Sequence, residues 1–309
     1  MAEPPEEVRR LAEERAARRA ERDFAAADAL RDRLADLGWS VVDEPGGYRL
    51  EPLAPPEGIA RRPLRPGDVQ SVLDDPPSAD ASVHWISEGW PQDVLRGMAS
   101  VDRHAGPRSV QHVVVDVAGA DPTGWPRDVE VWSLEPGTGW AAARNAGLRR
   151  SRGRIVVVVD GSVEADGDVL GPLEEALADP SIGICGPYGI VTEDLRSFRE
   201  SPGPDVDAIE GYLMAFRREL LQAGLAFDER FRFYRTADIE LSFRVKERGL
   251  RAVVVPVPVV RHEHRVWTHT PPEERERLSK RNFYRFLERF RGRFDLTVQG
   301  RAPDDGRTP

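Results

Sequence analysis

The chain has 309 residues, 40% hydrophobic and 31% charged, and is therefore long enough for one main domain and a small accessory unit. Its formal net charge of -9 excludes a general electrostatic grip on nucleic acid, because binding to phosphates needs a basic surface. The single cysteine, Cys185, lies in an apolar run and is expected to be buried, as suits a reducing cytoplasm.

The first fifty residues predict a small helical domain. Residues 6–37 are almost all Ala, Arg, Glu, Asp and Leu, and apolar residues from Phe24 to Leu37 recur at spacings of three and four, typical of one or two amphipathic helices. Gly38 ends this pattern. Residues 39–42 and 48–50 flank a Pro-Gly-Gly turn and predict a short β-hairpin that completes the domain at residue 52.

This segment resembles the carboxy-terminal helical domain of cysteinyl-tRNA synthetases. The resemblance is carried by Ala-Ala-Arg at 16–18, by Arg-Asp-Phe-Ala-Ala-Ala-Asp-Ala-Leu-Arg-Asp at 22–32 and by the glycine-rich turn that follows. The synthetase's zinc-binding and nucleotide-binding parts have no counterpart in the sequence, which excludes aminoacylation. A helix pair for self-association or for binding another protein is favoured over a contact with tRNA.

A proline-rich segment separates this unit from the rest. Prolines at 52, 55, 56, 63, 66, 76 and 77 are too frequent for a continuous helix or a central strand, so residues 53–79 are predicted to be an extended linker. From residue 82, short valine-rich segments alternate with helical patterns, which predicts a mostly parallel sheet sandwiched by helices over residues 80–297. The polar residues 298–309 are expected to form a disordered tail.

Two of the valine-rich segments end in an aspartate, Asp116 and Asp160. Because ligands of an open parallel sheet gather at the carboxyl ends of its strands, both aspartates are candidates for a binding crevice. Ser87, at the end of the first strand, is a candidate neighbour of Asp116. An ordinary turn is the alternative for Asp160 and Gly161, because both residue types are favoured in turns.

Four motifs in order resemble family 2 glycosyltransferases. They are the strand ending on Asp116, the run Gly-Trp-Ala-Ala-Ala-Arg-Asn-Ala-Gly at 139–147, the strand ending on Asp160, and the segment 224–244 that contains Asp238. The resemblance covers roughly residues 82–294 and implies the GT-A fold. It further implies an inverting enzyme that moves a sugar from a nucleoside diphosphate sugar to an acceptor hydroxyl, with an acceptor that the sequence does not identify.

The resemblance assigns roles to single residues. Asp238 takes the position of the catalytic base that removes the acceptor proton. Asp116 takes the position of the nucleobase contact, and Asp160 that of the ribose contact. Candidates for the nucleotide and diphosphate pocket are Arg144, Asn145 and Arg281, with packing or a surface salt bridge as the alternative for the first two.

Binding of a divalent metal is left open by the sequence. The family's Asp-x-Asp motif reads Asp160, Gly161, Ser162, so a hydroxyl stands where the resemblance implies a carboxylate ligand, and magnesium and manganese prefer charged oxygens. Asp160 and His262 are the candidate ligands, with His264 as a second histidine. Glu164 or Asp166 could also replace the missing carboxylate if the loop turns back.

The surroundings of Asp238 also depart from the family pattern. The usual Glu-Asp pair reads Ala237, Asp238, and the next acidic position is Glu240. Without the acidic neighbour, we expect Asp238 to hold its proton less tightly than it would beside a like charge. Capping the helix that follows is the alternative role for Asp238.

Two rival functions remain from the sequence. The altered positions 162 and 237 are compatible with a catalytically degenerate GT-A protein that binds a sugar nucleotide or a partner, and the first fifty residues are compatible with an RNA-associated adaptor. Apolar runs such as 253–260 are too short to cross a bilayer, so a cytoplasmic protein is expected. The aromatic face of residues 278–290 could rest on the inner membrane surface, although packing in the core is favoured.

Overall fold

The computed structural model describes residues 4, 6–21, 23–36, 39–44, 47–52, 63–120 and 124–300. Gly38, the first two residues of the predicted Pro-Gly-Gly turn, the start of the predicted linker and nearly all of the predicted tail lie outside these ranges. The chain divides into two compact units, Met1–Ile59 with Asp121–Glu130, and Ala60–Ala120 with Val131–Pro309.

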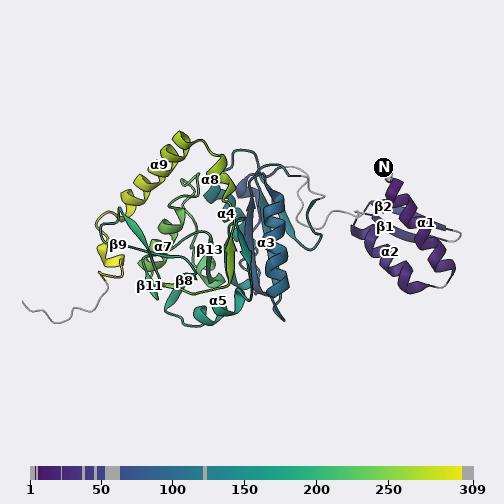
Figure 1. Ribbon diagram of the computed structural model, residues 1–309, viewed down its shortest axis with the longest axis horizontal. Coiled ribbons are helices and arrows are strands. Elements are labelled where there is room, and N and C mark those ends of the chain that lie inside the picture. Colours follow the sequence, from purple (N-terminus) through teal and green to yellow (C-terminus); the bar gives the residue numbers. More distant parts are fainter. Residues whose placement is uncertain are drawn as a thin grey trace, which may run out of the picture. The chain divides into compact units, whose positions relative to one another are not determined.

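The first unit contains the predicted helices and hairpin (Figure 1). Helices α1 (Glu6–Ala20) and α2 (Phe24–Asp36) are followed by strands β1 (Trp39–Glu44) and β2 (Gly47–Pro52), which pair in antiparallel fashion. A small core is buried between them, formed by Val8, Leu11, Ala12, Leu30, Leu34 and Trp39. Phe24 departs from the predicted apolar stripe, since its side chain is exposed.

An ion pair ties the helices of this unit to its hairpin. The guanidinium of Arg15 is buried, and its two terminal nitrogens donate to the carboxylate of Asp43 over 2.8 and 3.1 Å. The hydrogen bonds from Arg15 lower the pKa of Asp43. Such a bidentate ion pair is specific in geometry as well as in charge, so it fixes the orientation of β1 relative to α1.

The remaining elements follow in chain order. They are η1 (Pro66–Asp68), β3 (Ala79–Ser87), α3 (Pro91–His104), β4 (Val110–Asp116), β5 (Glu130–Ser133), α4 (Trp140–Leu148), β6 (Gly153–Val159), β7 (Val163–Ala165), α5 (Leu170–Leu177), β8 (Ile182–Gly186), β9 (Gly189–Thr192), β10 (Phe198–Ser201), β11 (Asp205–Val206), β12 (Ala208–Ile209), β13 (Leu213–Arg217), α6 (Arg218–Gln222), α7 (Ala237–Glu247), β14 (Arg251–Val254), β15 (Val259–Arg261), α8 (Arg265–His269), α9 (Pro272–Phe290) and η3 (Phe294–Leu296).

An eight-stranded sheet in the order β11-β14-β8-β13-β6-β3-β4-β5 forms the centre of the second unit. Strand β3 pairs in parallel with β4 and β6, and β14 pairs in parallel with β8, whereas β13 is antiparallel to its neighbours. The predicted mostly parallel sheet is therefore confirmed. The parallel strands bring the ends of β3, β4 and β6 to one edge, so Ser87, Asp116 and Asp160 emerge at the same side of the sheet.

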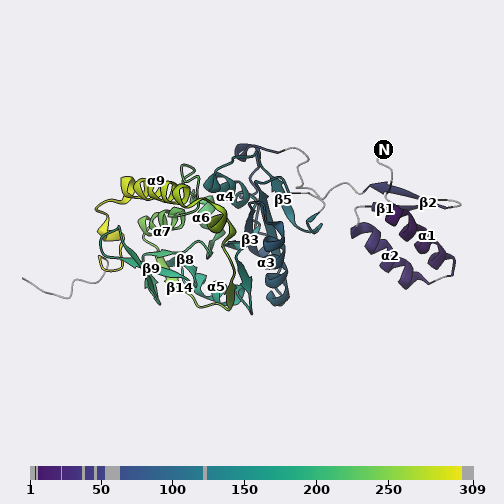
Figure 2. The ribbon, with the colours of Figure 1, turned by 45° about the horizontal axis from the view of Figure 1, so that its top comes forward.

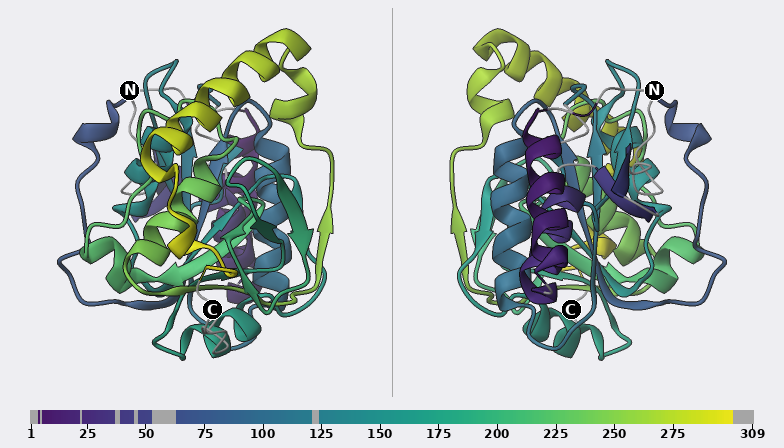
Figure 3. Two further views of the ribbon diagram at one scale, coloured as in Figure 1. Left: turned by 90° about the vertical axis from the view of Figure 1, so that its left-hand side faces the viewer. Right: turned by 90° about the vertical axis from the view of Figure 1, so that its right-hand side faces the viewer.

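Helices cover both faces of this sheet, as predicted. Residues of α3 and α5 pack beside Val83 and Val157 on one face, while α4, α7 and α9 pack beside Val156 and Val158 on the other. Figure 3 shows α3 (blue) on one side and α7 and α9 (green and yellow) on the other, and Figure 2 shows α9 lying along α7. Cys185 is buried in β8, which confirms its apolar role. No helix of the described segments has both the length and the apolarity to cross a membrane.

The segment 63–79 differs from the linker that its prolines predict. Val69 and Val72 are buried against the second unit, and Leu64 bridges to Leu134. Arg149 and Arg218 donate to carbonyl groups of this segment. Prolines exclude the segment from a sheet ladder, but two apolar side chains and two arginine donors still dock it, so the second unit begins before residue 80.

Candidate active site

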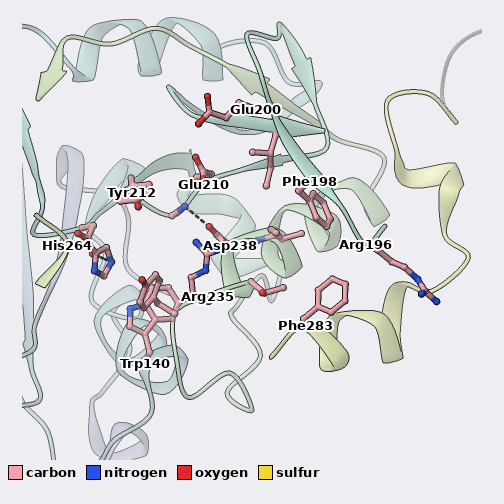
Figure 4. A pocket seen from close by; sticks show the side chains of 16 residues that line it. Trp140, Arg196, Phe198, Glu200, Glu210, Tyr212, Arg235, Asp238, His264 and Phe283 are labelled. Atoms are coloured by element: carbon pink, nitrogen blue, oxygen red, sulfur yellow. Dashed lines mark hydrogen bonds and ion pairs between the residues drawn. The ribbon is translucent and has the colours of Figure 1, made fainter. Parts of the chain in front are cut away.

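A cavity of about 400 Å³ opens beside the end of β6 and the start of α7 (Figure 4). It is lined by Trp140, Asp160, Ile190, Arg196, Phe198, Glu200, Glu210, Gly211, Tyr212, Tyr234, Arg235, Thr236, Asp238, Ile239, His264 and Phe283. Asp160 and Asp238 thus share one hollow, although 78 positions separate them in the chain. Polar and aromatic side chains converge here, as is usual for a small-molecule site.

Asp238 is anchored by backbone donors at the floor of this cavity. It is the second residue of α7, and its carboxylate accepts hydrogen bonds from the N–H of Gly211 over 2.8 Å and from that of Ile239 over 2.9 Å. Thr236, the N-cap residue, has a left-handed backbone with φ of 72°. A non-glycine residue in this conformation is strained, and such strain is characteristic of functional sites.

The pKa of Asp238 differs from our expectation. Burial raises it above its ordinary value, and the two backbone hydrogen bonds and the charge of Arg235 only partly offset this effect. The sequence pointed to a weaker hold on the proton because position 237 lacks a carboxylate. Desolvation of the group, which depends on the fold, has the larger effect.

Glu210 is an acidic neighbour that sequence analysis missed. It precedes β13, lines the cavity with Asp238, and has a pKa raised first by burial and next by the charge of Asp238. Figure 4 shows the two side chains close together with Arg235 beside them. The like charge that is missing at Ala237 is therefore supplied from a segment that no motif marked.

Both carboxylate oxygens of Asp160 face donors. Oδ1 accepts hydrogen bonds from the backbone N–H of Ser162 over 2.9 Å and from its hydroxyl. Oδ2 lies 3.4 Å from Nε2 of His264. Asp160 therefore adopts the turn that its sequence permits and also lines the cavity.

The histidine nearest Asp160 is His264, whereas His262 was the predicted ligand. Nε2 of His262 lies 2.8 Å from Glu164, and its exposed side chain is directed to that partner. Strand β15 ends at Arg261, and the chain then turns into α8 with His264 as its N-cap residue, which aims the two histidines differently. Asp166, the other proposed replacement ligand, is exposed.

Arg144 and Asn145 make structural contacts within the protein, and their predicted contact with a nucleotide stays a prediction. The buried guanidinium of Arg144 donates to carbonyls of His84 and Val159, and burial lowers its pKa to about 10. Asn145 exchanges two hydrogen bonds with the backbone of Phe227. Both side chains join α4 to its neighbours, whereas Trp140 of the same motif lines the cavity.

Ser87 and Asp116 lie opposite each other on adjacent strands. Both are buried, and Oδ2 of Asp116 accepts the N–H of Ala120 over 2.8 Å. Oγ of Ser87 and Oδ1 of Asp116 have no hydrogen-bond partner among the described residues. Two neighbouring buried polar atoms without partners are suited to a polar ligand.

Arg281 is exposed on α9, and the adjacent Asn282 makes the contact that matters to the site. The buried amide of Asn282 donates to the carbonyls of Phe233 and Arg235 over 2.7 and 2.8 Å, which holds the loop before α7. Phe283 lines the cavity, and the next apolar positions of α9 lie in the core, as favoured.

The described residues do not fit the divalent metal that the GT-A fold implies. Among them, no group of three or more His, Cys, Asp or Glu side chains is placed to hold an ion. Asp160 is the carboxylate at the motif, and its Oδ1 already accepts two hydrogen bonds from Ser162.

The comparisons with protein families identify the segment that carries much of this site. Residues 192–284 match the family described as Glycosyltransferase like family 2. This segment includes Glu210, Asp238 and His264, so the part of the chain that is similar to this family carries three residues of the cavity. The match supports the predicted family on residues that line the cavity.

Solved structures support the same fold. The second unit is similar to the crystal structure of GalNAc-T7 with UDP, GalNAc and Mn2+, with a TM-score of 0.57 at 17% identity over 68% of this chain and 48% of that one. The mannosyltransferase PcManGT from Pyrobaculum calidifontis, in complex with GDP-Man and Mn2+, gives a TM-score of 0.47 at 23% identity over 67% and 63% of the two chains. The similarity to GalNAc-T7 confirms the predicted GT-A fold.

Short stretches of curated proteins also match. The chain is 55% identical over 51 residues to cysteine–tRNA ligase of Opitutus terrae and 48% identical over 61 residues to cysteine–tRNA ligase 1 of Burkholderia lata. These matches cover 16% and 17% of this chain. The chain spans only 11% and 13% of the length of these relatives, so the similarity concerns one small segment of each ligase.

Proposed function

We propose that the second unit is an inverting glycosyltransferase that moves a sugar from a nucleoside diphosphate sugar to an acceptor hydroxyl. The observation that carries this proposal is the shared cavity: Asp160 and Asp238 line one hollow of about 400 Å³. The match of residues 192–284 to a glycosyltransferase family supports the same reaction class. The nucleotide and the sugar are not specified by these observations.

Asp238 acts as the general base in this proposal. As the acceptor oxygen bonds to the anomeric carbon, the bond from that carbon to the diphosphate breaks, and Asp238 takes the hydroxyl proton. Attack on the face opposite the leaving group inverts the anomeric configuration. A raised pKa suits this role, because a carboxylate that holds a proton more tightly is a stronger base.

The donor binds at the strand ends. Ser87 and Asp116 offer unpartnered polar atoms for the nucleobase, and Asp160 is placed next along the sheet to contact the ribose. These assignments extend the roles that the sequence resemblance implies. The diphosphate then lies beside His264, on the wall of the cavity nearest Asp160.

The acceptor binds towards the β9–β10 hairpin and α9. Phe198 and Phe283 line this side, and Figure 4 shows both near Arg196, away from His264. Tyr212 faces the cavity under the guanidinium of Arg261, whose central carbon lies 3.5 Å from the ring centroid. Aromatic rings at such positions suit the apolar faces of a sugar ring.

Release of nucleoside diphosphate from a panel of UDP-, GDP- and dTDP-sugars tests this function. Wild-type protein is expected to turn over at least one donor, and Asp238→Asn to abolish turnover while it still binds the nucleotide. Asp166→Asn is the matched control, because it removes an exposed carboxylate that is not part of the cavity lining. Binding without turnover by wild type across the panel would instead favour the catalytically degenerate alternative.

The first unit is proposed to bind a protein partner or a second copy. Its ionic groups include the buried pair of Arg15 and Asp43 and surface pairs such as Arg18 with Glu21. Mixed charges of this kind do not provide the basic surface that RNA binding needs. A gel shift of tRNA by residues 1–52 would overturn this assignment and favour the adaptor alternative.

A further inference from the structure

The environment of His264 determines which nitrogen of the ring carries hydrogen. His264 is the N-cap residue of α8, and its Nδ1 accepts a hydrogen bond from the backbone N–H of Trp267 over 3.3 Å. A neutral imidazole that accepts at Nδ1 carries its hydrogen at Nε2. Nε2 is the nitrogen that faces Asp160, so a donor points into the site.

This arrangement opposes metal binding by His264. To bind an ion through Nε2, the ring would carry its hydrogen at Nδ1, where the N–H of Trp267 already points at it. Histidine ligands of metals normally donate from their other nitrogen to a carbonyl or a carboxylate. Here the other nitrogen meets a donor, so His264 suits hydrogen-bond donation and not ligation.

Aromatic packing holds the ring in this orientation. His264 stacks on Tyr234 with ring centroids 4.4 Å apart and planes 23° apart. Tyr212 meets it edge-on, with centroids 6.0 Å apart. A 180° flip of the ring, which exchanges Nδ1 with Cδ2 and Nε2 with Cε1, would remove the contact with Trp267, so the cap favours the observed orientation.

Ser162 provides two hydrogen-bond donors to Oδ1, the other carboxylate oxygen of Asp160. Its side chain is buried, and both its backbone N–H and its hydroxyl donate to Oδ1. The residue at the position of the missing carboxylate therefore satisfies Asp160 instead of adding a second negative ligand. A hydroxyl donor therefore stands at the position where the sequence resemblance implies a carboxylate ligand.

We infer, building on the proposed glycosyltransferase function, that the donor diphosphate is bound without a divalent cation and that the Nε2–H of His264 donates to it. Nε2 lies 3.4 Å from Asp160 without a hydrogen bond between them among the described contacts, so this hydrogen is available to a phosphate oxygen. Arg235, on the same cavity wall, adds a positive charge. Charged and polar N–H groups of this kind stabilise phosphate oxygens.

Nucleotide binding in the presence and absence of metal tests the inference. Calorimetric titration of wild type with UDP, GDP and dTDP is carried out in EDTA and again in millimolar Mn²⁺. The affinity for the preferred nucleotide is expected to agree within about threefold between the two conditions. Binding that appears only with Mn²⁺ would overturn the inference and leave the proposed function standing.

Variants of His264 test the donor. His264→Ala is expected to weaken metal-free nucleotide binding about tenfold, and His264→Gln to restore part of it, because glutamine keeps an N–H donor. His262→Ala is the matched control and should leave the affinity unchanged, since its ring pairs with Glu164. Equal affinities of His264→Ala and wild type in EDTA would refute the donor role.

Ser162→Asp provides the converse experiment. A carboxylate next to Asp160 adds negative charge where the phosphate lies, so metal-free binding is expected to fall and Mn²⁺ is expected to restore it. A variant that binds as well as wild type in EDTA would contradict the inference. Absence of turnover with every donor, alongside metal-free nucleotide binding, would refute the proposed function and not the metal-free site.

Discussion

The two ends of the cavity use the same residue type in different ways. Asp160 lies among donors, because Ser162 hydrogen-bonds to one oxygen and His264 lies near the other. Asp238 lies near another carboxylate, Glu210, and burial raises its pKa. A carboxylate paired with hydrogen-bond donors suits a stable contact with substrate, whereas one with a raised pKa beside a like charge suits proton transfer. The comparison shows that the environment, more than the aspartate itself, separates binding from catalysis.

Exchange of each carboxylate for its amide gives the largest expected effect. Asp238→Asn should lower kcat by about 10³-fold with little change in nucleotide affinity, because it removes the base. Asp160→Asn should mainly weaken nucleotide binding. Steady-state kinetics and calorimetry on both variants measure the two effects. Equal losses of kcat and affinity in both variants would show that Asp160 and Asp238 do not divide binding from catalysis.

Glu240, two residues beyond Asp238 on α7, extends the comparison to another buried carboxylate. Its buried oxygens accept no hydrogen bond within the described ranges, and Arg244 and Arg289 lie 3.8 and 3.7 Å from Oε1. Burial outweighs these two charges and raises the pKa of Glu240 from 4.5 to about 7. The folded protein therefore holds this proton more tightly than the unfolded chain does, and the free energy of unfolding falls as pH rises from about 4.5 through about 7.

Glu240→Gln should remove this pH dependence. At pH 8 we expect the variant to be more stable than wild type by about 2–3 kcal/mol, with little difference near pH 4. Urea unfolding at both pH values measures it. Glu247→Gln, on the same helix but paired with Arg289 and Arg293, is the control and should not stabilise the protein. A wild-type stability that stays constant across this range would contradict the assignment.

Asn282→Ala tests how the loop before α7 is held. The change leaves the carbonyls of Phe233 and Arg235 without their buried donor, which should cost about 1–3 kcal/mol of unfolding free energy. Because this loop carries part of the cavity wall, KM for the acceptor should rise as well. Arg281→Ala, at the exposed neighbouring position, should change neither quantity. An Asn282→Ala variant with unchanged unfolding free energy and unchanged KM would show that other contacts hold the loop.

Arg235→Leu gives the smallest expected effect. The positive charge of Arg235 lowers the pKa of Asp238, so its removal should raise that pKa. Activity requires ionised Asp238, and therefore the acidic limb of the kcat/KM profile should move to higher pH. A profile measured from acidic to neutral pH reports the shift. A limb that moves to lower pH would mean that another group controls it.

The sequence located the strand ends and Asp238 because local patterns mark them. Valine runs ending in aspartate predict β4 and β6, and the acidic segment marks the start of α7. Glu210 carries no such mark, since its importance comes from a contact with a residue 28 positions away in the chain.

The direction of side chains is the other feature that the sequence did not predict. Arg144 lies in the expected helix, but its guanidinium points into the protein and bonds backbone carbonyls. A spacing of two on an extended strand would place His262 and His264 on one face, but β15 ends at Arg261. Residue type and spacing predicted the elements, whereas burial and the end of a strand decided what each side chain reaches.

The contact of Asn282 with the loop before α7 has a consequence during protein synthesis. Asp160, Glu210 and Asp238 all leave the ribosome before α9, so a nascent chain possesses the acidic side chains while the carbonyls of Phe233 and Arg235 still lack their amide donor. Only after α9 has emerged and docked does the loop gain its anchor and the cavity gain Phe283. Maturation of the cavity is thereby timed to the emergence of α9, which follows the other elements that line it.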